Sequence, residues 1–347
     1  MKMTLAILGI IVVLVISFIG WAAWPWSLDR KVLNPGIVQF DDILTNDEEP
    51  AVIKVLSWNL GFLYGDGSEG PGYEYQDQAF FENKLTQLVE QIKTWDPDVI
   101  CFQEIDFNSH RSHYKNQARE VARRAGYPFV AEAISWESNY IPFPYWPPRN
   151  NFGRMSSGGA VLSKYPILEH QVELLRKPLS QPWWYNLFYL HRYFQRVSID
   201  FGAGRKLKFI NLHLEAFDKS ERAEQIQLLV NDKTGLDVIA GDFNMVPDSA
   251  TKKKKFKNSD DYENDPSFSL MTKTQYQEVI PEEIYSKEEA LYFTYPASRP
   301  DRRLDYIFYE KGHKMMKAEV FPSQVSDHLP IRAIFQIGSP RVNPFSL

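Results

Sequence analysis

Carboxylate, amide and histidine side chains recur where apolar segments of this sequence end. Asn59, Glu104 and His213 each come directly after a run of mainly apolar residues that is typical of a buried β-strand. Functional side chains of α/β proteins gather at the carboxyl ends of strands. Carboxylates and histidines that meet at such an edge are suited to general acid–base chemistry.

Further candidates follow in the second half of the chain. Asp242 and Asn244 are two positions apart, so in an extended segment both side chains point the same way. Asp305 has apolar residues on both sides and would be costly to bury as an ion without a partner. An adjacent carboxylate and imidazole, Asp327 and His328, complete the set.

Each of these residues also has an ordinary structural explanation. Asn59 and Asp242 could be turn residues, and the Asp327–His328 pair could lie in a surface turn. His213 could be a buried histidine whose hydrogen bonds are satisfied. The case for function therefore rests on the whole set, in which the buried charge expected at Asp305 carries the most weight.

The elements that would position these side chains form a layered domain. Apolar runs predict strands at residues 52–57, 99–102, 159–163, 196–200, 207–212, 238–240, 304–309 and 331–336. Helical patterns cover residues 81–95, which end at Asp96-Pro97, and residues 220–231. Many strands with few helices between them predict an α/β or α+β domain. Residues 136–152, 182–194 and 251–268 are expected to be inserted loops, the last of them solvated and mobile.

The N-terminal region predicts a membrane helix. No charged residue occurs from position 3 to 28, and residues 5–24 are almost wholly apolar, which is long enough to cross a bilayer. The predicted organisation is an anchor at 1–28, a polar juxtamembrane linker at 29–50, a catalytic domain at 51–338 and a tail at 339–347. A cleaved signal peptide is the alternative. Lys2 favours a cytoplasmic N-terminus and an extracytoplasmic domain, although Arg30 and Lys31 favour the reverse.

Composition limits the classes of partner. The net charge is −5 and the isoelectric point is near 5.9, which disfavours a protein that holds nucleic acid by bulk electrostatics. The single cysteine, Cys101, lies in an apolar run, so an intrachain disulfide is impossible and a buried thiol is expected. Nothing in the sequence indicates an obligate protein partner.

Taken together and in order, five motifs resemble the endonuclease/exonuclease/phosphatase family. They are Trp58-Asn59, Phe102-Gln-Glu104, Gly241-Asp-Phe-Asn244, Arg303-Leu-Asp-Tyr-Ile307 and Ser326-Asp-His-Leu-Pro330. The resemblance spans about residues 52 to 336. It implies a four-layered sandwich of two mixed β-sheets flanked by helices, with the site at one edge where strand ends converge.

The resemblance also implies a role for each candidate. Glu104 would be the principal ligand of Mg²⁺ or Mn²⁺, with Asn59 close by and Asp327 at a second metal position. His328 would be the general base, and Asp305 would accept its other ring proton. The remaining roles concern water and phosphate: Asp242 orients the water, Asn244 donates to a phosphoryl oxygen, and His213 stabilises the phosphate or protonates the leaving oxygen. Apart from the resemblance, Arg154 is expected to bind substrate together with Asn59 and Asn244.

The substrate is left open between three classes. A histidine in Asn211-Leu-His-Leu-Glu215 resembles the pancreatic-type deoxyribonucleases, the sphingomyelinases and the inositol-phosphate phosphatases, and departs from the abasic-site endonucleases. A lipid phosphodiester is favoured by the predicted anchor and by the aromatic residues of 183–194, which could enter a bilayer interface or equally pack as core. A surface nuclease, or a phosphatase of inositol phosphates or other small phosphoesters, is the alternative.

Overall fold

The protein folds as two seven-stranded β-sheets packed face to face. The computed structural model describes residues 2–25, 31–46, 49–65, 74–258 and 260–337. In order across the first sheet, its strands are β1 (Lys31–Leu33), β7 (Ile167–Leu174), β8 (Tyr193–Asp200), β9 (Lys206–His213), β10 (Val238–Asp242), β12 (Asp305–Glu310) and β11 (Tyr276–Glu278). Those of the second sheet are β13 (Lys314–Val320), β14 (Ile331–Gln336), β3 (Val52–Asn59), β4 (Val99–Asp106), β6 (Gly153–Ser163), β5 (Phe129–Ile141) and β2 (Ile37–Gln39).

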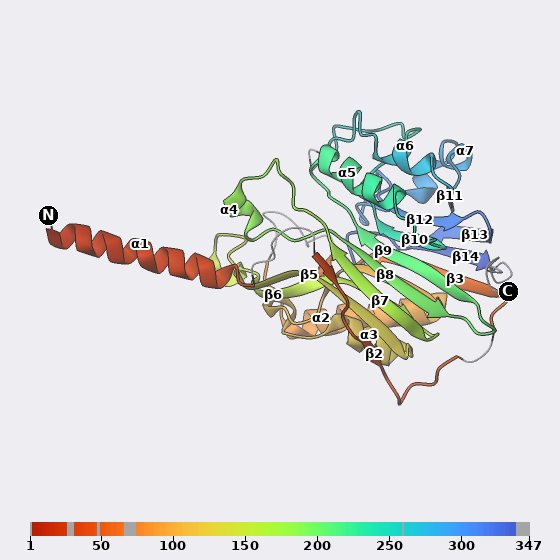
Figure 1. Cartoon of the computed structure of the whole chain (residues 1–347), viewed down its shortest axis with the longest axis horizontal. Coiled ribbons are helices and arrows are strands. Elements are labelled where there is room, and N and C mark those ends of the chain that lie inside the picture. Colours follow the sequence, from red (N-terminus) through yellow and green to blue (C-terminus); the bar gives the residue numbers. More distant parts are fainter. Residues whose placement is uncertain (1, 26–30, 47–48, 66–73, 259, 338–347) are drawn as a thin grey trace.

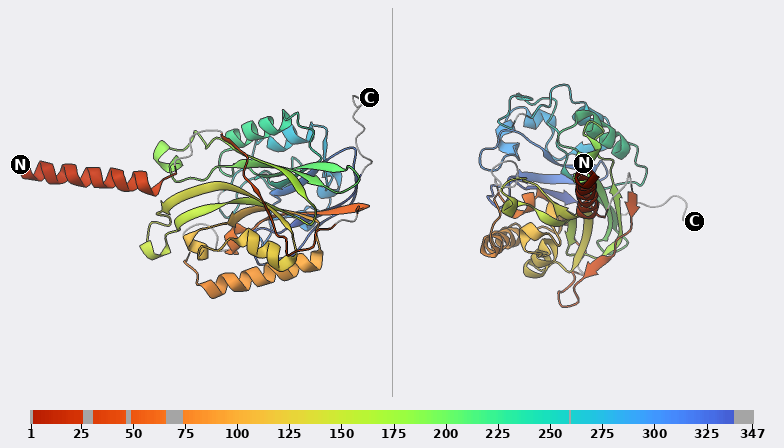
Figure 2. Two further views of the ribbon diagram at one scale, coloured as in Figure 1. Left: turned by 60° about the horizontal axis from the view of Figure 1, so that its bottom comes forward. Right: turned by 90° about the vertical axis from the view of Figure 1, so that its left-hand side faces the viewer.

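Helices cover the outer face of each sheet, which makes four layers (Figures 1 and 2). On the second sheet lie α2 (Gln78–Trp95) and α3 (Gln117–Ala125), and on the first lie α5 (Lys219–Val230) and α6 (Ser267–Thr272). A third apolar cluster fills the space between the sheets and includes Cys101, as expected for a buried thiol. The four-layered sandwich inferred from the motifs is confirmed.

Two parallel strand pairs bring the candidate residues to one edge. In each sheet only one neighbouring pair of strands runs parallel within the described residues: β3 with β4, and β9 with β10. The carboxyl ends of parallel strands meet at the same edge. Asn59 therefore lies opposite Gln103, and Asp242 lies opposite His213 on one side and Asp305 on the other.

Local sequence explains where the two long helices begin and end. The side chain of Asp77 accepts a hydrogen bond from the backbone nitrogen of Phe80 and caps α2, which ends where Asp96 adopts a left-handed conformation before a proline. Asp218 caps α5 through the backbone nitrogens of Ser220 and Glu221. Both helices were expected from the sequence, and both start slightly earlier than their apolar patterns suggested.

The fold begins earlier than residue 50. Strand β1 adds to the edge of the first sheet beside β7, and β2 adds to the edge of the second beside β5. Part of the segment expected to be a juxtamembrane linker is therefore edge structure of the domain. Residues 26–30 and the tail predicted at 339–347 lie outside the described residues.

The three expected loops are only partly loops. Residues 136–141 belong to β5, and Tyr193 and Phe194 are buried in β8. In the connection between β7 and β8, residues 183–186 form the short helix α4 (Trp183–Asn186). Residues 251–268, which begin with the lysine-rich segment Lys252 to Lys255, were expected to be a solvated loop. Phe256 and Tyr262 are instead buried in a small apolar cluster, which corrects that expectation for the part that the structure describes.

Helix α1 (Lys2–Ala22) projects away from the sandwich (Figures 1 and 2). It is long and apolar enough to cross a membrane, by length and composition, and almost all of it is exposed. Its last turn contacts the end of β5, where Asn139 donates a backbone hydrogen bond to the carbonyl oxygen of Trp24 at 2.8 Å and a side-chain hydrogen bond to that of Trp21 at 3.0 Å. The rings of Phe18 and Tyr140 lie 6.0 Å apart.

Candidate active site

A buried histidine–aspartate pair lies at the edge where the strands converge. His328 Nδ1 is 2.8 Å from Asp305 Oδ2, and both side chains are almost fully buried. Because Nδ1 donates to the carboxylate, Nε2 is left to accept a proton. Nε2 lies 3.9 Å from Asp242 Oδ2. The imidazole Nε2 of the pair thus faces a further carboxylate, and His328 gives the buried Asp305 the partner that its apolar surroundings require.

The imidazole is held from several sides. The carbonyl oxygen of His328 accepts a hydrogen bond from Trp58 Nε1 at 2.9 Å, and its backbone nitrogen donates to Ser326 Oγ at 3.1 Å. The ring of Tyr295 packs against it with centroids 4.7 Å apart. The hydroxyl of Thr294 accepts from the backbone nitrogen of Asp305 at 3.2 Å. Sequence alone did not identify Thr294 or Tyr295, because their segment carries no strand or motif signal.

Asp242 links the two sheets. Asn59 Nδ2 donates to Asp242 Oδ2 at 3.0 Å, and the backbone nitrogen of Asn244 donates to Asp242 Oδ1 at 2.9 Å. Strand β10 needs a glycine directly before Asp242, because a Cβ at Gly241 would overlap the carbonyl oxygen of Leu212 on the neighbouring strand. The side chain of Asn244 donates to the carbonyl oxygen of Leu214 at 3.0 Å.

Glu104 reaches the site because β4 is irregular there. The pairing register of β4 with β6 shifts between Phe102 and Ile105, and Glu104 itself has a left-handed backbone with φ of 49°. Its Oε1 lies 3.7 Å from Nε2 of His213. Such outliers gather at functional sites, where surrounding structure holds them.

Asp327 is buried beside Asn59. Its Oδ1 accepts from Ser326 Oγ at 3.2 Å, and Ser326 Oγ also donates to the backbone oxygen of Asn59 at 2.7 Å. A Cβ at Gly61 would overlap the carboxylate of Asp327, so the chain after Asn59 passes directly against it. The candidates Asn59, Glu104, His213, Asp242, Asn244, Asp305, Asp327 and His328 therefore lie in one region.

Arg154 lies apart from this region. It is exposed near the start of β6 and does not line either cavity of the site. The start of β6 pairs with the far end of β5, remote from the β4 segment that carries Glu104. The structure therefore gives no support to a substrate-binding role for Arg154.

A buried arginine, Arg192, lines both cavities of the site. Its guanidinium hydrogen-bonds Nε2 of His213 through Nη1 and Tyr189 Oη at 3.2 Å through Nη2, and its Nε lies 3.5 Å from Glu215 Oε2. His213 Nε2 is also 3.4 Å from Asp242 Oδ2. The sequence signal was weak, because Arg192 stands between an aromatic segment and a strand and belongs to none of the motifs.

Burial and crowded charges shift the ionisation of these groups. Burial, with Asp305 nearby, raises the pKa of Asp242 to about 6. Burial opposes protonation of His328, but Asp305, Asp242 and Asp327 outweigh it and raise the pKa of His328 well above its ordinary value. Burial, Arg192 and His328 together hold the pKa of His213 well below its ordinary value, so His213 is neutral.

The donors of the site fit a divalent cation of the Mg²⁺ or Mn²⁺ type. Asn59, Glu104, Asp242 and Asp327 offer carboxylate and amide oxygens, which these ions prefer, and no thiolate is near. Burial and the nearby Asp305 raise the pKa of Asp242, and a bound cation would favour the ionised form of this carboxylate. One atom each of Asp242, Asp305 and His328 lies within 4.8 Å of the others.

Two cavities meet at the site. The smaller one, of about 40 Å³, is polar and is lined by His213, Asp242, Asn244 and His328. The larger one, of about 570 Å³, is mostly apolar and runs beneath α4. Glu104, Arg192 and Phe217 line both cavities. The polar centre therefore opens onto an apolar groove.

Comparisons with known proteins agree with this geometry. A model of the endonuclease/exonuclease/phosphatase family matches residues 56–328. Nocturnin of Xenopus laevis is 26% identical over 93 residues, which are 26% of this chain and only 22% of that protein. The crystal structure of an endonuclease/exonuclease/phosphatase from Beutenbergia cavernae aligns with a TM-score of 0.62 at 18% identity and covers 84% of this chain and 72% of that one. The human nocturnin catalytic domain with bound sulfate aligns with a TM-score of 0.54 at 16% identity and covers 88% and 97%.

Proposed function

Because this chain belongs to the endonuclease/exonuclease/phosphatase family and is a phosphoester hydrolase, we propose that it is anchored in a membrane and cleaves a lipid phosphodiester with Mg²⁺ or Mn²⁺. The observation that carries the catalytic part is the His328–Asp305 pair, whose free nitrogen faces Asp242 across a polar cavity. The family relationship reaches from β3 to His328 and so includes every residue used in the mechanism below.

The base is His328. Asp305 fixes its tautomer and stabilises the charge that appears when Nε2 accepts a proton from the attacking water. Asp242, held by Asn59, orients that water towards phosphorus. Attack forms the new phosphorus–oxygen bond as the bond to the leaving oxygen breaks, and the leaving oxygen takes a proton from water while protonated His328 later returns its proton to solvent. A divalent cation held by Glu104 and Asn59, with Asp327 at a second position, would supply Lewis acidity and neutralise phosphate charge.

The opposite wall of the cavity stabilises the phosphate. Neutral His213 receives a hydrogen bond from Arg192, and so positions the guanidinium with the help of Tyr189 and Glu215. Arg192 then offers positive charge where negative charge develops in the transition state. Asn244, whose amide also donates to the Leu214 carbonyl, would donate to a phosphoryl oxygen.

The anchor would be α1, with a single pass and the domain outside the cytoplasm. Support comes from its length, its apolar composition and the charge of Lys2 at its start. The proposed division is an anchor at 1–28, a connection through residue 50 that includes β1 and β2, a catalytic domain at 51–338 and a tail at 339–347. No obligate protein partner is required by this scheme.

A lipid phosphodiester is favoured over DNA by the surroundings of the site. The groove that shares Glu104 and Arg192 with the polar cavity is apolar. Part of the positive charge of the lysine-rich segment is already paired, because Lys252 lies 3.1 Å from Asp301 and Lys254 lies 2.8 Å from Glu263. Nucleic-acid binding depends on unpaired basic residues that contact phosphates.

The test uses the full chain in nanodiscs with bis-p-nitrophenyl phosphate, sphingomyelin, phosphatidylinositol phosphates and plasmid DNA. Hydrolysis should require a divalent cation, stop with EDTA and return with excess Mg²⁺ or Mn²⁺. Full turnover in EDTA would refute the metal-dependent mechanism. Rapid cleavage of DNA, or of a water-soluble inositol phosphate, with lipids untouched would replace the lipid assignment by the corresponding alternative.

A further inference from the structure

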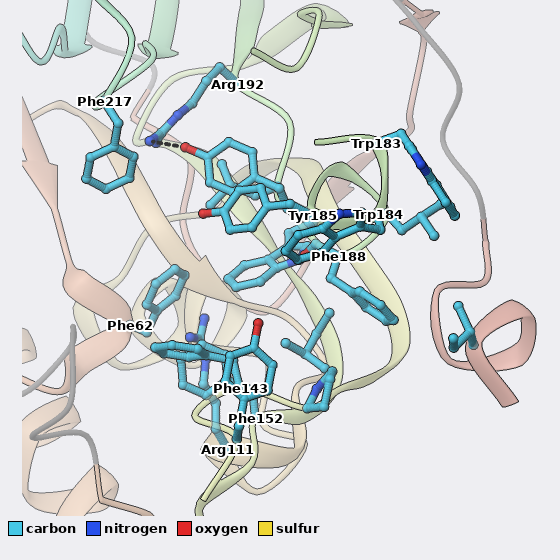
Figure 3. Close-up of a pocket in the computed structure, with 18 of the residues that line it drawn as sticks. Phe62, Arg111, Phe143, Phe152, Trp183, Trp184, Tyr185, Phe188, Arg192 and Phe217 are labelled. Carbon is cyan, nitrogen blue, oxygen red and sulfur yellow. Dashed lines mark hydrogen bonds between the residues drawn. The ribbon is translucent and has the colours of Figure 1, made fainter. Parts of the chain in front are cut away.

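The apolar groove beside the active site is lined by aromatic and aliphatic side chains from separate parts of the chain (Figure 3). Its volume is about 570 Å³. One wall comes from the segment that contains α4, and the other comes from the end of β5 and the loop after it. The apolar lining includes Phe143, Phe152, Trp184, Leu187, Phe188 and Phe217.

One end of the groove adjoins the polar catalytic cavity, and the other end adjoins helix α1. At the polar end, Glu104 and Arg192 belong both to the groove and to the catalytic cavity. At the other end the lining includes Ile19, which belongs to α1, the helix able to span a bilayer. A single apolar passage therefore connects the anchor to the phosphate-binding residues.

Charge inside the groove is neutralised. Arg111 lines it, but its guanidinium binds both carboxylate oxygens of Asp106, each at 3.1 Å, and stacks on the ring of Phe62 at 3.4 Å from the centroid. Arg111 therefore offers no unpaired charge to an anion. Away from its catalytic end, the groove suits a hydrocarbon chain better than a second polar group.

The aromatic residues of α4 are not core. Trp183 is 75% exposed and Trp184 is 55% exposed, although both line the groove. Tyr145, on the opposite wall, is 68% exposed. The hydrogen bonds from Asn139 dock the last turn of α1 on β5, and Ile19 of α1 lines the same groove as these three aromatic residues. Exposed aromatic rings at that position suit a bilayer interface.

We propose that the groove binds the hydrocarbon chain of a membrane phospholipid while its phosphate lies between Glu104 and Arg192, the lipid entering sideways from the bilayer that holds α1. This inference rests on the proposed phosphoesterase function and adds the place of the tail and the route of entry. Phe217, which lines both cavities, marks the boundary between tail and phosphate.

The test compares two synthetic diesters with the same reacting group, hexadecyl p-nitrophenyl phosphate and ethyl p-nitrophenyl phosphate, on the full chain in phosphatidylcholine nanodiscs. Trp184→Ser and Leu187→Lys alter the groove, and neither residue belongs to the catalytic cavity. The matched control is Leu179→Ser, because Leu179 is an exposed apolar residue close to α4 that does not line the groove.

Both groove variants should lower kcat/KM for the hexadecyl ester by about tenfold or more and leave the ethyl ester within about twofold, because only the long ester loses buried methylene contacts. The control should leave both substrates within about twofold of the unaltered chain. Equal losses on both esters, or no loss on the hexadecyl ester, would overturn the tail-binding groove. If the unaltered chain cleaves neither ester nor bis-p-nitrophenyl phosphate, the proposed hydrolase function fails instead.

A binding measurement separates the groove from catalysis. Hexadecyl phosphate with a photoreactive diazirine on its chain is irradiated with the full chain in EDTA, and the labelled peptides are identified by mass spectrometry. Labelling should fall at residues 142–152 and 183–190 and decrease in Leu187→Lys. Labelling confined to residues 5–17, or none, would overturn the proposal.

Discussion

Replacing Asp305 by Asn tests the centre of the mechanism with little change in shape. Asp305 Oδ2 accepts from His328 Nδ1, whereas Asp305 Oδ1 has no hydrogen-bond partner in the described residues. In the Asp305→Asn variant, an amide nitrogen at the Oδ2 position would donate to Nδ1 and place the imidazole proton on Nε2. An amide nitrogen at the other position would be buried without an acceptor. Either orientation weakens the base.

The magnitude follows from the geometry. At the 2.8 Å separation of Nδ1 and Oδ2, an imidazolium and a carboxylate attract each other by about 6 kcal/mol at an effective dielectric constant of about 20. The variant loses this attraction in the transition state, offset by the lower cost of burying a neutral amide. The expected fall in kcat is on the order of 10² to 10⁴-fold, which corresponds to about 3 to 5 kcal/mol.

The assay is hydrolysis of bis-p-nitrophenyl phosphate with saturating Mg²⁺, with thermal unfolding measured in parallel. The chain contains a matched control, because Asp237 pairs with His313 at 3.0 Å near the start of β10, at the opposite end of the strand from Asp242. Asp237→Asn removes the same kind of pair and should leave kcat unchanged. A fall of less than about tenfold in folded Asp305→Asn would refute the assignment of His328 as the base.

Four further outcomes are expected. Glu104→Gln should raise the Mg²⁺ concentration for half-maximal rate by on the order of tenfold or more, because one charged oxygen donor is lost, and an unchanged metal titration would contradict the ligand assignment. Arg192→Met should lower kcat on the order of 10²-fold while Arg192→Lys recovers part of it, and equal rates for Met and Lys would mean that the charge is unimportant. Gly241→Ala should destabilise the fold by about 3 kcal/mol in urea, because its Cβ overlaps a carbonyl oxygen, whereas Gly204→Ala, also at positive φ but with open space, should cost about 1 kcal/mol. A chain that begins at residue 29 keeps β1 and β2 and should hydrolyse bis-p-nitrophenyl phosphate at close to the full rate, and an insoluble product would contradict that boundary.

The site was predictable wherever a motif ties a polar residue to a strand end. Asn59, Glu104 and Asp242 end or interrupt buried strands. The strand register brings Asn59 and Asp242 to one edge, and the irregularity of β4 brings Glu104 there. Arg154 is exposed and lines neither cavity, and the exposure of a lone basic residue on a strand cannot be predicted from its neighbours in sequence, so its role in substrate binding stays a prediction. Arg192 was missed because its role depends on Glu215 and His213, which lie on other segments of the chain.

Several of the elements missed from the sequence have weak apolar patterns. The two edge strands β1 and β2 have three residues each and bury little, and β2 follows the turn sequence Asn34-Pro-Gly36. In β7 a register shift between Ile167 and Glu169 breaks the alternation of buried and exposed residues. Helix α3 is rich in arginine and buries mainly Ala118, Val121 and Ala122, so it is defined by its caps at Asn116 and Gly126 more than by periodicity.

The candidate active site is built from residues of both sheets, so activity is expected to be lost when the sheets separate on unfolding. Asn59 and Glu104 belong to one sheet, and Asp242 and Asp305 belong to the other. Gln103 and Asn211 join the sheets directly behind them through a buried hydrogen bond of 2.7 Å. The sheets cannot separate without pulling apart the groups that act on phosphorus. Loss of turnover on heating should therefore coincide with global unfolding, and fraying of edge strands such as β2 should leave the rate intact.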